Sequence, residues 1–146
     1  MSNTPLRLIV GTLSGGLLMG LTFAVFSTIL LYGIAKENTG GSPVFSWVTT
    51  IVFLEFIMGF VFGLIFGLLL SIANLRPVFG TIAGIVASVV PLWIWLTEPV
   101  LAHSKIWPTF LKVTVPFACG LVGLFTSLAV TRISRRRWKH GNNTRQ

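Results

Sequence analysis

The amino-acid sequence predicts an all-α integral membrane protein, a bundle of four transmembrane helices with both termini in the cytoplasm. Hydrophobic residues make up 53% of the 146 residues and charged residues only 10%, against roughly a quarter charged in soluble domains. The chain contains four apolar runs, each about as long as the 20 residues that a helix needs to cross the hydrocarbon. Its basic residues gather at alternate ends of these runs, as the positive-inside rule expects.

The four runs predict helices over residues 6–35, 44–73, 78–96 and 106–131. Polar, glycine-rich or proline-rich segments separate them, and these segments are typical of turns. A β-barrel would instead show segments of about ten residues with alternating apolar and polar positions. Because the runs are apolar on all sides, we expect helices in one transmembrane domain spanning 1–146, with a basic cytoplasmic tail at 132–146.

Charge predicts the orientation. Three of the eleven basic residues would lie outside: Lys36, Lys105 and Lys112. The other eight would lie in the cytoplasm: Arg7, Arg76, Arg132, Arg135, Arg136, Arg137, Lys139 and Arg145. This asymmetry favours a plasma (inner) membrane protein with both termini inside, and it explains the net charge of +8 without nucleic acid. We expect the tail residues Arg135, Arg136, Arg137 and Lys139 to contact anionic lipid of the inner leaflet.

Small residues recur at spacings near four in every run. Such spacing places them on one face of a helix, and glycine there lets helix backbones approach closely, which promotes association in lipid. The predicted packing residues are Gly15, Gly20, Gly59, Gly63, Gly67, Gly80, Gly84 and Gly123. Packing within one chain is the simplest interpretation. Self-association, docking onto a larger complex, or a glycine-lined permeation path are the alternatives.

Glu55 is the acidic residue deepest inside a predicted span. It lies eleven residues past Val44, about 16 Å along the helix, and shares a four-residue spacing with Gly59 and Gly63. With no second carboxylate on another span, the favoured interpretation is a structural hydrogen bond or an ion pair with Lys112, unless Lys112 extends to the outer surface. The alternative is a proton or cation site, which an ionisable group at this depth allows.

Several other residues carry expectations about structure. Pro91 and Pro116 lie inside spans and remove backbone donors, so each is expected to kink its helix. The outer ends of three spans carry tryptophans that are typical of an interfacial belt: Trp47, Trp93, Trp95 and Trp107. Residues 19–23 and 58–62 resemble each other. Because these segments would run antiparallel, we do not expect a duplicated unit here.

The chain has no pattern that indicates catalysis, a metal or a cofactor. Cys119 is the single cysteine, and the two histidines lie outside the predicted spans. We therefore expect a non-enzymatic multipass membrane protein that acts through helix packing, as a homo-oligomer or as a subunit of a larger membrane complex. The alternative is a small oligomeric transporter or channel with Glu55 as its ion-responsive residue.

Overall fold

The computed structural model describes residues 4–39, 45–73, 76–97 and 107–143, with side chains described for 4–36, 48–73, 76–97 and 108–133. The described elements are α1 (Thr4–Thr39), α2 (Phe45–Ala73), α3 (Pro77–Ala87), α4 (Val89–Thr97) and α6 (Trp107–Asn143). They provide four segments long and apolar enough to cross a membrane: Thr4–Lys36, Val48–Ala73, Pro77–Thr97 and Pro108–Ile133. The predicted all-α class and the four membrane-length helices are confirmed, whereas the side of each terminus stays a prediction.

The first two helices extend close to the polar turn that the sequence predicts between them. α1 contains 36 residues, which correspond to about 54 Å and exceed the roughly 30 Å thickness of the hydrocarbon. It continues past the predicted end at Ala35, because Lys36 and Glu37 are good helix formers. α2 starts two residues after Pro43, a residue type that is common at the start of a helix and disfavoured in its interior.

The third crossing, predicted as one helix over 78–96, is divided into α3 and α4 at Ser88. Pro91 explains the division, because it cannot donate to the carbonyl four residues earlier and its ring crowds that oxygen. At the division, the Ser88 hydroxyl donates to the Ile85 carbonyl at 2.6 Å. Pro116 lies inside the continuous helix α6, so the kink expected at this residue stays a prediction.

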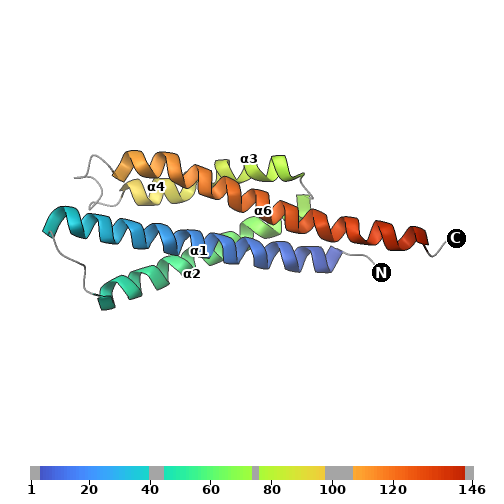
Figure 1. The fold of residues 1–146 in the computed structure, drawn as a ribbon, viewed down its shortest axis with the longest axis horizontal. Coiled ribbons are helices and arrows are strands. Elements are labelled where there is room, and N and C mark those ends of the chain that lie inside the picture. Colours follow the sequence, from blue (N-terminus) through green and yellow to red (C-terminus); the bar gives the residue numbers. More distant parts are fainter. Residues whose placement is uncertain (1–3, 40–44, 74–75, 98–106, 144–146) are drawn as a thin grey trace.

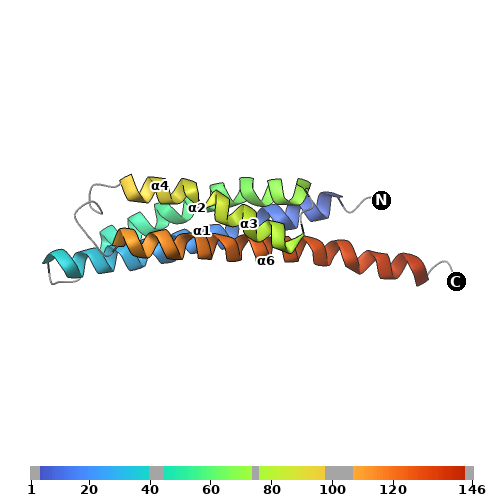
Figure 2. The same ribbon diagram turned by 90° about the horizontal axis from the view of Figure 1, so that it is seen from above.

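The last helix continues through most of the predicted tail. α6 runs to Asn143, whereas the sequence predicts the end of the span at Thr131. Arginine and lysine have high helix propensity, and no proline follows Pro116, so the helix has no reason to end at the predicted boundary. Its final part projects beyond the other helices in Figures 1 and 2. The side chains of Arg135 to Lys139 lie outside the described residues.

The helices associate in two pairs. α1 packs along α2, α3 packs along α6, and α1 also contacts α6, which joins the pairs. α1 begins and α6 ends at the same end of the molecule (Figure 1), here called the terminal end, and the opposite end is called the loop end. The buried core where the pairs meet includes Met19, Phe23, Phe66, Trp95, Leu111, Val115, Cys119 and Val122.

Large apolar side chains cover the outside of the described bundle. Phe53 on α2 is 62% exposed, Trp93 on α4 is 71% exposed and Phe117 on α6 is 69% exposed. Exposure of so many apolar side chains would be unfavourable in water and suits contact with lipid. The outer surface therefore agrees with a membrane location.

Candidate functional site

The predicted glycines of α1 and α2 lie at very close contacts between these two helices. A Cβ atom added to Gly15 would lie 2.6 Å from the Gly63 carbonyl oxygen and 2.8 Å from the Gly67 Cα atom. A Cβ atom on Gly67 would meet the Gly11 carbonyl and lie 3.2 Å from the Gly15 Cα atom. These neighbours are backbone atoms, which cannot move aside as a flexible side chain can. Glycine is therefore required for this approach.

The second helix pair repeats this geometry. A Cβ atom on Gly123 of α6 would meet the Gly80 carbonyl and lie 3.3 Å from the Gly84 Cα atom of α3. One on Gly84 would meet the Cys119 carbonyl. Each pair also places a serine hydroxyl against the first glycine: Ser71 against Gly11, and Ser127 against Gly80.

The equivalent contacts come from equivalent sequences. Residues 6–15 are LRLIVGTLSG and residues 75–84 are LRPVFGTIAG, with five of the ten positions identical. Residues 67–76 are GLLLSIANLR and residues 123–132 are GLFTSLAVTR, again with five of the ten identical. The chain therefore contains two copies of a helical hairpin, one in each half. The sequence similarity between residues 19–23 and 58–62 is not part of this repeat.

Gly20 and Gly59 extend the contact between α1 and α2 towards the loop end. A Cβ atom on Gly20 would lie 3.1 Å from the Phe56 carbonyl oxygen, and one on Gly59 would lie 2.7 Å from the ring of Phe23. Aromatic rings therefore cover these two glycines, in place of the glycine backbone found nearer the terminal end. All eight predicted packing glycines lie at contacts between helices of this one chain.

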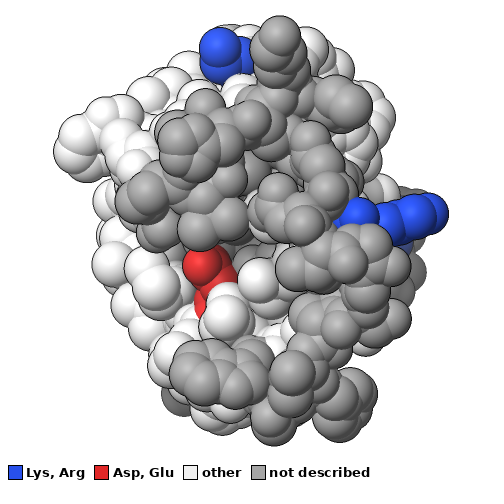
Figure 3. All heavy atoms as spheres, turned by 90° about the vertical axis from the view of Figure 1, so that its left-hand side faces the viewer, with Lys and Arg blue, Asp and Glu red and all other residues white. Residues whose placement is uncertain are grey.

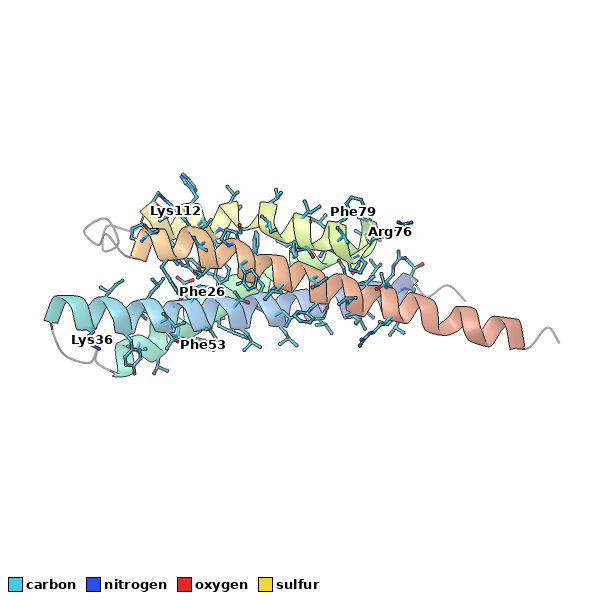
Figure 4. The ribbon with its side chains drawn as sticks, turned by 45° about the horizontal axis from the view of Figure 1, so that its top comes forward. Phe26, Lys36, Phe53, Arg76, Phe79 and Lys112 are labelled. Carbon is cyan, nitrogen blue, oxygen red and sulfur yellow. The ribbon has the colours of Figure 1, made fainter. Side chains whose placement is uncertain are left out.

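The two hairpins meet through an apolar and aromatic core. Met19 and Cys119 are both 0% exposed, and their sulfur atoms lie 3.9 Å apart. The Trp95 ring lies 5.0 Å from the ring of Phe23 and 5.9 Å from that of Phe26. Figure 4 shows Phe26 in the space between α1 and α6. Trp95 is only 4% exposed, so the expectation that it belongs to an interfacial belt is wrong.

Glu55 is half-buried on α2. It takes part in a hydrogen-bonding or electrostatic interaction. In the end-on view of Figure 3, acidic atoms lie within the outline of the molecule and basic atoms lie at its edges. Lys112 is exposed, and Figure 4 shows it at the edge of the bundle opposite Lys36. An ion pair between Glu55 and Lys112 stays a prediction.

A groove between the loop-end halves of α1 and α2 is a feature that the sequence analysis missed. Its volume is about 430 Å³, and its lining includes Ala24, Thr28 and Tyr32 from α1 with Val52 and Phe53 from α2. The sequence did contain a sign of this groove. Ala24 and Thr28 are small residues four positions apart on one face of α1, beyond the part of α1 that packs against the glycines of α2.

No group of three or more metal-ligating side chains occurs among the described residues. No family model, curated protein or solved structure matches the chain.

Proposed function

We propose that this protein is a small multipass membrane protein that acts through helix packing, as a homo-oligomer or as a subunit of a larger membrane complex. The observation that carries the proposal is the repeated glycine contact, Gly15 with Gly67 and Gly84 with Gly123. Close backbone contact provides dispersion energy, which in lipid replaces the missing hydrophobic drive. Each hairpin is thereby suited to act as a rigid element that presents a fixed surface to neighbours.

The centre of the bundle supports a packing role over solute passage through a single chain. Met19, Leu111 and Cys119 are 0% exposed and Val115 is 1% exposed. Permeation paths are lined by polar groups or backbone carbonyls that replace the water around the solute. Apolar side chains in mutual contact fill this central position instead.

Purification in mild detergent, followed by light scattering and mass spectrometry, tests the proposal. We expect a single defined assembly that is either larger than one chain or contains another membrane protein in fixed ratio. Chemical cross-linking in the native membrane before extraction controls for dissociation by detergent. A chain that is monomeric in both experiments, without a partner, contradicts the proposal.

Glu55 supports a second candidate function, ion-coupled transport by an oligomer. It is half-buried on a membrane-length helix and has an interaction partner, and intramembrane acidic residues are typical of proton and cation pathways. Proteoliposomes with an internal pH dye would test this candidate. A cation or proton flux that Glu55→Gln abolishes supports it, whereas no flux above that of empty vesicles contradicts it.

A further inference from the structure

The groove between α1 and α2 begins where their glycine contacts end. The two helices separate towards the loop end (Figure 1), beyond the point where Phe23 covers Gly59. Ala24 and Thr28 then leave space on α1, while Phe53 and Phe56 form part of the opposite wall on α2. The resulting cavity of about 430 Å³ is within the size range of sites for small molecules.

The length of the groove matches one leaflet of a bilayer. The α1 lining of the groove runs from Ala24 to Tyr32, eight residues or about 12 Å along the helix, and Lys36, where the membrane-length segment ends, lies one turn further on. One leaflet contributes about 15 Å of hydrocarbon. A transmembrane helix from a partner would need contact across both leaflets, but the lining of the groove does not extend past Ala24 towards the terminal end of α1. An acyl chain needs only one leaflet.

The end of the groove nearest the membrane surface has the polar groups that a phosphate requires. Tyr32 lines the groove and is 45% exposed, which leaves its hydroxyl able to donate. Lys36 follows one helical turn later and is exposed. Figure 4 shows Lys36 and Phe53 on the same side of α1. A lysine near the membrane surface attracts anionic headgroups.

We infer that this groove binds one glycerophospholipid of the leaflet at the loop end. One acyl chain lies along Ala24, Thr28 and Phe53, and the phosphate lies at Tyr32 and Lys36. In the second hairpin Trp93 stands at the sequence position equivalent to Ala24, so the small side chain that leaves space on α1 has no counterpart there. The inference therefore concerns the first hairpin.

Photolabelling of the full-length protein tests the acyl-chain position. The protein is placed in phosphatidylcholine vesicles that contain phosphatidylglycerol with a diazirine on its acyl chain, irradiated, digested and analysed by mass spectrometry. We expect label concentrated on residues 24–32 and 48–56. Ala24→Trp, which places a large side chain in the groove, should lower this label to the level of the general lipid-facing surface. Thr28→Leu should lower it in part.

Two control variants separate the groove from the general surface. Leu17→Trp adds the same side chain to α1 at a position that is 51% exposed and outside the groove, so labelling should not change. Lys36→Gln should weaken phosphatidylglycerol retention in native mass spectrometry about fivefold, the equivalent of ~1 kcal/mol. Arg132→Gln removes one charge near the terminal end and should leave retention unchanged.

Three outcomes overturn the inference. Uniform labelling of all lipid-facing residues would show that the groove holds no particular lipid. Equal effects of Lys36→Gln and Arg132→Gln would show that only net charge attracts the headgroup. Conversion of an oligomer to a monomer by Ala24→Trp, with unchanged lipid labelling, would identify a helix of a second copy as the occupant.

Discussion

Gly15 of α1 and Gly67 of α2 face each other so closely that a Cβ atom on Gly15 would lie 2.8 Å from the Gly67 Cα atom. Gly84 and Gly123 have the same relationship in the second hairpin, where a Cβ atom on Gly123 would lie 3.3 Å from the Gly84 Cα atom. Contact at the level of the backbone leaves no room for any side chain. These two contacts hold together the two helix pairs.

Gly67→Ala and Gly123→Ala are expected to destabilise the protein by similar amounts. Each added methyl group would meet a carbonyl on the paired helix, and overpacking of this kind costs about 1–3 kcal/mol. Unfolding in mixed detergent micelles, followed by circular dichroism, measures the change in free energy. Because the two glycines lie in separate helix pairs, the double variant should show additive losses within about 0.5 kcal/mol.

Gly120→Ala is the matched control for these two variants. The nearest atoms to its added methyl group would be side-chain atoms of Ile85, at 3.1 Å, and Thr81, at 3.5 Å. Side chains can shift by a few tenths of an ångström, so we expect a smaller loss than at Gly123. Equal losses at Gly120 and Gly123 would mean that contact between backbones is not what makes Gly123 necessary.

Trp95→Ala is expected to cost about 3–5 kcal/mol, the range for removal of a large aromatic side chain from a core. Trp95 is 4% exposed and contacts the rings of Phe23 and Phe26. Trp93, two residues away on the same helix, is 71% exposed. Trp93→Ala should therefore cost only about 0.5 kcal/mol in the same unfolding measurement. A larger loss of stability for Trp93→Ala than for Trp95→Ala would show that α4 is rotated from its described position.

The sequence was sufficient to predict the helices but not how they pair. Apolar length alone locates the four crossings, because a bilayer sets the same requirement for each. Stripes of small residues occur in all four runs, so the stripe containing Gly15 could in principle have met any of the other three. Only the structure selects α2 as its partner and α6 as the partner of the stripe containing Gly84.

The internal repeat is present in the sequence, but it relates whole hairpins and not the two helices within one hairpin. The comparison of 19–23 with 58–62 paired two helices of one hairpin, which run in opposite directions. The matching segments are 6–15 and 75–84, the first helices of two successive hairpins. Glu55 shows a different limit, because its depth follows from the sequence but its partner depends on helix rotation and loop placement.

The repeat strengthens the topology prediction. Each copy contains two crossings, so equivalent residues of the copies lie on the same side of the membrane. The repeat aligns Arg7 with Arg76 and Arg76 with Arg132, so all three should lie on one side of the membrane. The positive-inside rule places them together as well. A reporter fused after Gln146 should be cytoplasmic, and a cysteine introduced by Gly40→Cys should react with an impermeant reagent from outside.

The native Cys119 is buried, so it should not react in this labelling experiment. The unmodified protein is therefore the control. Reaction of the introduced cysteine only after the membrane is opened would place the loop end in the cytoplasm and reverse the orientation.

Substitution of Glu55 tests its two roles against each other. If the carboxyl group is a neutral donor, Glu55→Gln keeps its shape and a donor, and the stability should not change. If it is ionised against Lys112, the same change leaves an unpaired ammonium group. Removal of one partner from a buried pair costs about 3–5 kcal/mol, although the exposure of Lys112 reduces this cost.

A double-mutant cycle with Lys112→Met decides between these states. A true pair makes Lys112→Met restore much of the stability that Glu55→Gln removes, with a coupling energy of about 0.5–3 kcal/mol. A coupling energy near zero means that the partner of Glu55 is a different group. The transport role predicts a third pattern, in which Glu55→Gln has the stability of the native protein but no longer supports a pH-dependent flux in proteoliposomes. Unchanged stability together with unchanged flux would remove Glu55 from both roles.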